Sequence, residues 1–155
     1  PARAGERGRQ PPKQRPKVRQ ADDPTGMHEV NAKRESLELL EFVGLSAMEG
    51  ILAKDLTVAN QKRVEVARAL ATKPELLLLD EVMAGLTPTE VGSAIELIKE
   101  IGHRGITVFM IEHVMKAIMT VSDRIIVLHH GEKIAEGIPE EIATNPKVIE
   151  IYLGT

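Results

Sequence analysis

The sequence has 155 residues, of which 43% are hydrophobic and 28% are charged, a composition typical of a globular domain with its own core. It contains no cysteine, which excludes a disulfide framework and a thiolate metal site, and its two Phe and one Tyr provide no platform for stacking nucleic-acid bases. The net charge is -3, and no apolar run approaches the roughly 20 residues needed to span a bilayer.

The first 26 residues differ in composition from the rest of the chain. Residues 1–20 hold seven Lys or Arg against one acidic residue, and residues 1–26 hold five prolines and almost no large apolar side chain. Such a segment cannot bury enough surface to offset its conformational entropy. We therefore predict a basic, disordered leader over 1–26, either a flexible or non-native extension or a tail that contacts nucleic acid or acidic lipid.

Helical periodicity begins at Asn31, and Gly44 is a natural stop for this first helix. A short second helix is expected over 47–52. Thr57 then precedes a long predicted helix over 58–71. The inward-facing residues of this helix are expected to be Val64, Ala67, Leu70 and Ala71.

After Pro74 the pattern changes to short apolar strands that alternate with helices. Residues 76–79 and 106–111 are interpreted as buried strands, the first covered on both faces, and a helical pattern over 89–101 separates them. A helix over 113–121 follows. The remaining elements are a hairpin of strands 125–128 and 133–135 joined at His130-Gly131, and short helices over 139–143 and 147–153. The alternation predicts an α/β fold with a mostly parallel sheet.

Two carboxylates, Asp80 and Glu81, directly follow the first strand. Ligands of parallel α/β sheets bind beyond the carboxyl ends of the strands, and Mg²⁺ prefers carboxylate oxygens together with water and substrate phosphates. A second carboxylate beside the metal can orient or deprotonate a water molecule for attack on phosphorus. The alternative is that both acids are only helix N-terminal charges favoured by the helix dipole.

Thr57 and His113 are further candidates for the same site. Thr57 can cap the helix that follows it, whose first N–H groups form an anion site, although an ordinary N-cap is the commoner use of threonine. His113 lies just past the second strand, where its imidazole could reach the same sheet edge. A lone histidine at such a place is usually structural.

The combination of these features resembles the ATP-binding cassette ATPases. Asp80 follows Asn60 by 20 residues, and His113 follows Glu81 by 32 residues. The stretches ARALATKPELLLLDEVMAGLTPTE and GEKIAEGIPEEIATNPKVIEIYLG resemble, more narrowly, the cassettes of branched-chain amino acid importers. The resemblance covers about residues 31–154 and implies a partial P-loop NTPase fold, with flanking helices and part of the helical subdomain.

The resemblance implies roles for particular residues. Asp80 would hold Mg²⁺ through water, Glu81 would be the general base, and His113 would be the switch histidine that contacts the γ-phosphate. The D-loop would consist of Ala84, Gly85, Leu86 and Thr87, with Thr87 in place of the usual Asp or Asn.

The signature motif, usually Leu-Ser-Gly-Gly-Gln, corresponds to residues 56–61. Thr57 keeps the hydroxyl that would bond the γ-phosphate, whereas Val58 and Ala59 replace the usual glycines. The resemblance implies that the residues of this motif contact nucleotide held by a second subunit; they are Leu56, Thr57, Val58, Ala59, Asn60 and Gln61.

The sequence contains no Gly-Lys dipeptide, although the family cradles phosphates in a Gly-x-x-x-x-Gly-Lys-Ser/Thr loop. The family places that loop, its adenine-stacking aromatic and its Gln loop upstream of the helical region. We therefore expect the carboxyl-terminal half of a cassette. Its parts would be the leader over 1–26, a helical subdomain over 27–73, an α/β core over 74–137 and an importer-type tail over 138–155.

The function implied is that of the ATP-hydrolysing subunit of an importer for branched-chain amino acids or related solutes, with ATP and Mg²⁺ as cofactors. Its partners would be a second cassette subunit and membrane permease subunits at the cytoplasmic face of the membrane, without nucleic acid. Because the phosphate loop is absent, ATPase activity of the chain alone is left open.

Two alternatives remain. One is a non-catalytic interaction module whose signature helix completes the ATP site of a partner. The other is half of a split chromosome-maintenance ATPase. We rank it last, because residues 27–55 show none of the heptads of that type's long coiled coils.

Overall fold

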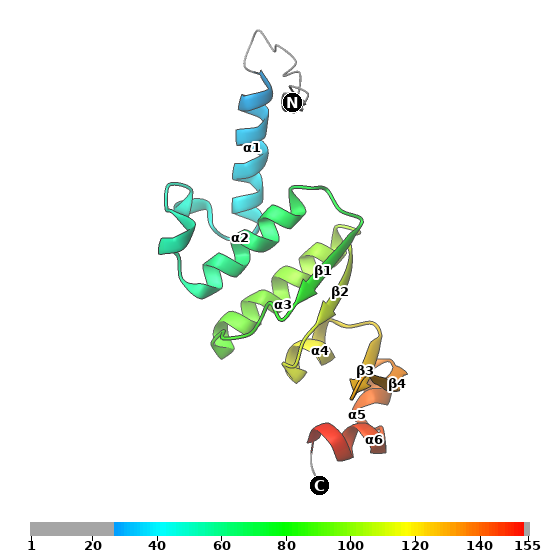
Figure 1. Cartoon of the computed structure of the whole chain (residues 1–155). Helices are drawn as coiled ribbons and strands as arrows, with labels where there is room; N and C mark the ends of the chain where they lie inside the picture. The colour runs from blue at the N-terminus through cyan, green and yellow to red at the C-terminus, as the bar shows by residue number, and fades with distance from the viewer. Residues whose placement is uncertain (1–26, 154–155) are drawn as a thin grey trace, which may run out of the picture.

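The computed structural model describes residues 27–153, and the predicted leader over 1–26 lies outside the described residues (Figure 1). The described part of the chain begins with α1 (Met27–Phe42), and Gly44 lies just after it with a φ of 76°, so the predicted stop is confirmed. The predicted helix over 47–52 is wrong. Two short 3-10 turns, η1 (Ser46–Met48) and η2 (Ala53–Asp55), stand there instead. Gly50 divides this stretch, and the pieces are too short to sustain an α-helix.

The next helix, α2 (Val58–Leu70), begins where Thr57 Oγ1 accepts a hydrogen bond from the Asn60 N–H at 3.3 Å, as an N-cap does. Its buried residues are Val66, Ala67 and Leu70. The predicted inward position of Ala71 is wrong, because Ala71 is the exposed C-cap residue. Val64 is half-buried.

An α/β unit follows, formed by β1 (Leu76–Asp80), α3 (Pro88–His103), β2 (Thr107–Ile111) and α4 (Met115–Val121). The strands β1 and β2 pair in parallel, with Leu78 opposite Phe109 and Asp80 opposite Ile111. Figure 1 shows α3 lying along one face of this pair. The predicted helix over 113–121 starts two residues late, so His113 stands in the connection before α4 and outside the helix.

An antiparallel hairpin and short helices complete the described part of the chain. The hairpin consists of β3 (Ile125–His129) and β4 (Glu132–Gly137). Its turn residues His130 and Gly131 have φ values of 49° and 81°, the left-handed geometry that a tight two-residue hairpin needs. The last elements are α5 (Pro139–Ala143), α6 (Pro146–Val148) and the π-helical turn η3 (Ile149–Leu153). The α/β class is confirmed, with one parallel and one antiparallel strand pair among residues 27–153.

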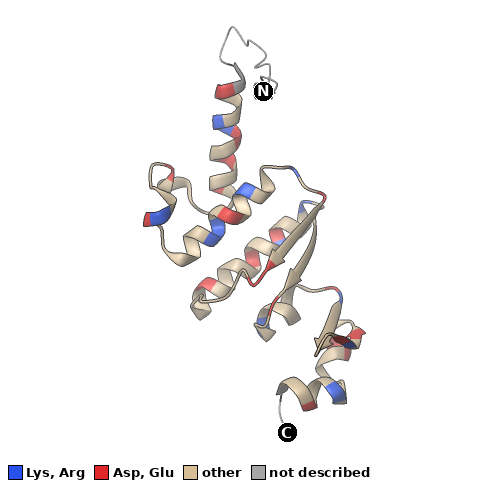
Figure 2. Cartoon of the chain, in the orientation of Figure 1, with Lys and Arg blue, Asp and Glu red and all other residues tan. Residues whose placement is uncertain are grey.

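The main core lies between α2, α3 and the inner face of β1, where Ile101 is fully buried and Met83 is 1% exposed. Charged residues lie mainly on the helices and turns, and Asp80 is the only one within β1 and β2 (Figure 2). None of the helices between residues 27 and 153 combines the length and the apolar character that a bilayer crossing requires.

The outer face of the parallel pair is apolar and exposed. We call Leu76, Leu78, Phe109 and Ile111 the open sheet face, and these side chains are 53%, 68%, 52% and 57% exposed. The prediction that 76–79 is covered on both faces is wrong for this chain, because Leu77 and Leu79 alone point into the core. The unbroken run of leucines nevertheless has the composition of a strand meant for burial on both sides.

We expect the open sheet face to make the chain self-associate. Each Leu or Phe side chain that leaves water on association contributes about 1.5–3 kcal/mol, so the double substitution Leu78→Lys, Phe109→Lys should weaken association at least about tenfold. Sedimentation velocity over a concentration series measures this. Ile126→Lys, at a residue 46% exposed on β3, is the matched control and should change little. A monomeric parent chain at ordinary concentrations would contradict the expectation.

Candidate functional site

The carboxyl ends of β1 and β2 bring together the two predicted catalytic residues, Glu81 and His113. Asp80 pairs with Ile111, and the Glu81 N–H extends the ladder by donating to the Ile111 carbonyl at 2.9 Å. As a result, Glu81 Oε1 lies 3.6 Å from His113 Nδ1. Both side chains are more than half exposed, at 58% for Glu81 and 65% for His113, so both remain accessible to a ligand.

The backbone of Glu81 adopts an unusual conformation, with a φ of 45°. A left-handed backbone costs a residue with a Cβ about 1–3 kcal/mol, and such residues gather at functional sites. Besides the turn bond from the Ala84 N–H to the Glu81 carbonyl at 3.1 Å, two contacts tie Glu81 to other elements. Its N–H donates to the Ile111 carbonyl, and its own carbonyl accepts a hydrogen bond from Lys62 Nζ at 3.1 Å. Lys62 lies on α2, so the helix that begins at the predicted signature motif contacts the Glu81 turn directly.

The predicted D-loop forms the tight turn between β1 and α3. The Met83 N–H donates to Glu112 Oε1 at 2.8 Å, and the Met83 carbonyl accepts from the Leu86 N–H at 3.2 Å. Gly85 lies between Met83 and Leu86 in this turn, and its φ is 77°, a value that glycine adopts without strain. The half-buried Ala84 lies in the same turn.

Thr87 ends the turn and starts α3 with a capping box. Its Oγ1 accepts from the Glu90 N–H, and Glu90 Oε2 accepts from the Thr87 N–H at 2.8 Å. The hydrogen bonds from the Thr87 backbone and hydroxyl lower the pKa of the Glu90 carboxyl, and the positive charge of Arg63 lowers it further. Thr87 therefore has a structural role in this chain, whatever else it contacts.

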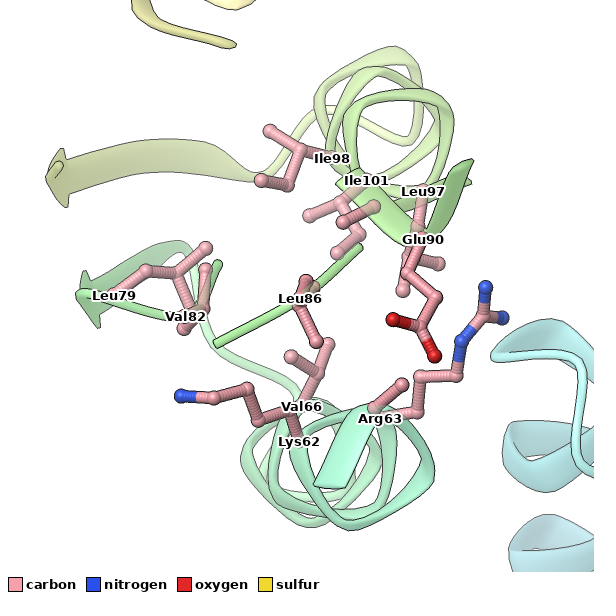
Figure 3. A pocket seen from close by; sticks show the side chains of 12 residues that line it. Lys62, Arg63, Val66, Leu79, Val82, Leu86, Glu90, Leu97, Ile98 and Ile101 are labelled. Carbon is pink, nitrogen blue, oxygen red and sulfur yellow. The ribbon is translucent and has the colours of Figure 1, made fainter. Parts of the chain in front are cut away.

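Two hollows flank the turn. A groove of about 350 Å³ opens between the turn and the segment that follows β2. It is lined by Met83, Ala84, Gly85, Leu86, Pro88, Val91, His113, Val114 and Lys116. A smaller cavity of about 40 Å³ lies between α2 and α3 (Figure 3). Arg63 and Glu90 lie toward each other at its edge, and most of its lining is aliphatic. His113 lines the groove but not the small cavity, so a ligand that contacts His113 would lie in the groove.

The predicted signature residues lie at the start of α2, where several of their side chains stabilise local structure. Asn60 Nδ2 donates to Met48 Sδ at 3.2 Å, and Gln61 Nε2 donates to the Ala53 and Leu56 carbonyls, both at 3.2 Å. Val58 is 56% exposed, and Ala59 lines the small cavity. Among the described residues, no hydrogen bond or ion pair joins residues 56–61 to Asp80, Glu81 or His113.

Sequence reasoning missed two residues that the structure places at this site, Lys62 and Glu112. Lys62 directly follows the signature motif, but its contact with Glu81 depends on how α2 packs beside β1. Glu112 could have been noticed as a carboxylate between an apolar strand and His113. Successive side chains of an extended chain point to opposite sides, so the position before an outward His113 is an inward one.

The acidic residues at the strand ends fit a magnesium ion only in part. Between residues 27 and 153, no group of three or more His, Cys, Asp or Glu side chains could hold a metal ion. Asp80 is exposed at the end of β1, with Glu81 next to it. Mg²⁺ commonly takes one or two carboxylates and completes its shell with phosphate and water. This donor set therefore fits a Mg²⁺ that arrives with a nucleotide, and it does not fit a metal held by protein alone.

Two family models of ATP-binding cassette transporters match parts of this chain. Residues 7–84 match a family model described as "ABC transporter", a match that begins inside the predicted leader. Residues 132–155 match one described as "Branched-chain amino acid ATP-binding cassette transporter".

Two curated relatives show how much of such a protein is matched. The "High-affinity branched-chain amino acid transport ATP-binding protein LivG" of Salmonella typhimurium is 47% identical over 116 residues, which cover 74% of this chain and 46% of that protein. The protein BraF of Pseudomonas aeruginosa, with the same description, is 41% identical over 128 residues, covering 79% and 50%. The chain thus spans about half the length of the curated relatives it matches.

Solved structures agree with the sequence relatives. The crystal structure of a nucleotide-free ATP-binding cassette from an ABC transporter matches with a TM-score of 0.73 at 31% sequence identity. The match covers 81% of this chain and 51% of that one.

Proposed function

This chain belongs to the ABC transporter family and has the cassette ATPase fold of its solved members, and on that premise we propose that it is the carboxyl-terminal part of an ATP-hydrolysing subunit. The transporter would import branched-chain amino acids or related solutes, as the descriptions of the sequence relatives suggest. The Glu81–His113 pair beside Asp80 is the observation that supports hydrolysis most directly.

The chain's own residues would divide the work at the strand ends. Asp80 would hold Mg²⁺ through water, and the ion would supply neutralisation of the charge on the β- and γ-phosphates. Glu81 would take a proton from the attacking water, because its exposed carboxylate can reach substrate while its backbone is held by Ile111 and Lys62. His113 would donate a hydrogen bond to the γ-phosphate from beside the groove.

The signature residues would act on nucleotide held by a second cassette subunit. Thr57 Oγ1 accepts the cap hydrogen bond from Asn60, which leaves its O–H free to donate to a phosphate oxygen. Val58 and Ala59 carry Cβ atoms where the family usually has glycines, so phosphate would approach this backbone less closely. The D-loop turn, from Ala84 to Thr87, would lie at the same subunit boundary.

The remaining partners follow from the same proposal. Membrane permease subunits would bind this subunit at the cytoplasmic face of the membrane. The open sheet face would pack against the part of a cassette that carries the phosphate loop, since apolar strands of parallel sheets are normally covered on both sides. The open face also favours a second candidate, the interaction module that only lends its signature helix to a partner.

Hydrolysis by a completed cassette separates these candidates. We define the chimaera as residues 27–155 joined to the phosphate-loop part of LivG from Escherichia coli, a relative 46% identical over 116 residues. We expect Mg²⁺-dependent ATP hydrolysis at least about tenfold above that of the LivG part alone. A folded chimaera that binds ATP without hydrolysing it would contradict the catalytic proposal and favour the interaction module.

A further inference from the structure

Glu112 is a half-buried carboxylate between the end of β2 and His113. Its Oε1 accepts a hydrogen bond from the Met83 N–H at 2.8 Å. Its Oε2 is buried and has no hydrogen-bond partner among the described residues. Burying an unpaired carboxylate oxygen costs free energy, so a residue of this kind is expected to have a specific task.

The backbone N–H of Met83, to which Glu112 is hydrogen-bonded, has a fixed position in the structure. It is 1% exposed and belongs to the main core, so the position of its N–H is set by the packing around it. The hydrogen bond from this N–H to the Glu112 oxygen, at 2.8 Å, has the ordinary length of such a bond and is directional. It fixes Glu112 relative to the core and so places His113, the next residue. The imidazole itself is 65% exposed, and its contact with Glu81 at 3.6 Å is too long to hold it alone.

We propose that Glu112 is a positioning residue. Its bond to Met83 locks the end of β2 against the turn between β1 and α3, and thereby holds His113 beside Glu81. The catalytic role of the Glu81–His113 pair rests on the proposed function. The hydrogen bond between Met83 and Glu112, which we call the lock, does not depend on that function. Because the partner is one neutral N–H, the acceptor oxygen and the side-chain length carry the role, and the negative charge does not.

Two substitutions of equal length separate acceptor from charge. E112Q keeps an acceptor oxygen and loses the charge, whereas E112M keeps the length and loses the acceptor. E96M is the control, because Glu96 is 73% exposed on α3 and pairs only with Lys99 among the described residues. For the measurement without nucleotide, all are made in the full 155-residue chain carrying Leu78→Lys and Phe109→Lys, which suppress association through the open sheet face. For ATP hydrolysis, they are made in the chimaera without these two substitutions.

The first measurement is made without nucleotide. In E112M the Met83 amide should exchange with deuterium about tenfold faster, because its one buried acceptor is gone. The nuclear Overhauser contact between the His113 ring and the Glu81 side chain should disappear in the same variant. E112Q and E96M should retain both the protection and the contact. Unchanged protection in E112M, or equal loss in E112Q, would overturn the proposal.

The second measurement tests whether the lock acts through His113. In the chimaera, E112M should lower kcat for ATP about tenfold and leave KM within about twofold, while E112Q stays within about threefold of the parent. In a His113→Ala background, E112M should cost nothing further, because both changes remove the same interaction. A further tenfold loss there would show an effect that bypasses His113 and would overturn the proposal. If the parent chimaera hydrolyses no ATP, the proposed function fails. The exchange rate of the Met83 amide still tests whether Glu112 holds the end of β2 in place.

Discussion

Replacing Glu81 by Gln in the chimaera should lower the single-turnover rate of ATP hydrolysis by about 10²- to 10⁴-fold, the usual loss when a general base is removed. Glutamine keeps the shape and a hydrogen-bonding group, but it cannot take a proton from the attacking water. The fold should survive, because the bonds that hold this turn to Ile111 and Lys62 come from the Glu81 backbone.

ATP binding should survive the same substitution, because the phosphate loop makes most of the phosphate contacts. ATP should therefore accumulate in a closed dimer, which gel filtration detects. Asp80→Asn should differ by also weakening the dependence on Mg²⁺, and His113→Ala should slow turnover without abolishing binding. Glu75→Gln, at an exposed carboxylate just before β1, is the matched control and should hydrolyse at the parent rate. If Glu81→Gln also hydrolyses at the parent rate, the strand-end carboxylates are structural.

Local signals in the sequence predicted much of the chain's architecture. Thr57 located the start of α2 because its hydroxyl satisfies an N–H that has no partner within the helix. His130-Gly131 located the hairpin because both residues tolerate a left-handed backbone. In each case the information lies within a few residues of the element, so no tertiary contact was needed to predict it.

Features set by distant contacts could not be predicted in this way. The four leucines of 76–79 indicate a strand buried on both faces, but which face is covered depends on segments elsewhere. Likewise, Lys62 reaches Glu81 across 19 residues of sequence, and Glu112 reaches Met83 across 29. Their type and spacing carry no signal for these pairings. The left-handed backbone of Glu81 is similar, because local preference opposes it and the neighbouring strand and helix impose it.

The 155-residue chain without a partner should bind Mg-ATP at least about 10³-fold more weakly than the chimaera. Three phosphate hydrogen bonds at about 1.5 kcal/mol each already amount to that factor, and a phosphate loop supplies more than three. The groups that the chain itself offers are few. Asp80 would act only through the metal, His113 would contact the γ-phosphate alone, and the signature residues would serve nucleotide on another subunit.

Titration with a fluorescent ATP analogue measures the difference, with a dissociation constant of about 1 mM or weaker expected for the chain and a micromolar value for the chimaera. Thermal unfolding gives an independent check. A ligand at 100 times its dissociation constant stabilises the folded state by about 2.7 kcal/mol, so Mg-ATP should raise the unfolding temperature of the chimaera and leave that of the chain unchanged. The chain carrying Leu78→Lys and Phe109→Lys controls for association. Low-micromolar binding by the chain alone would mean that its groove and strand ends hold phosphate without a phosphate loop, which would contradict the division of labour proposed for the cassette.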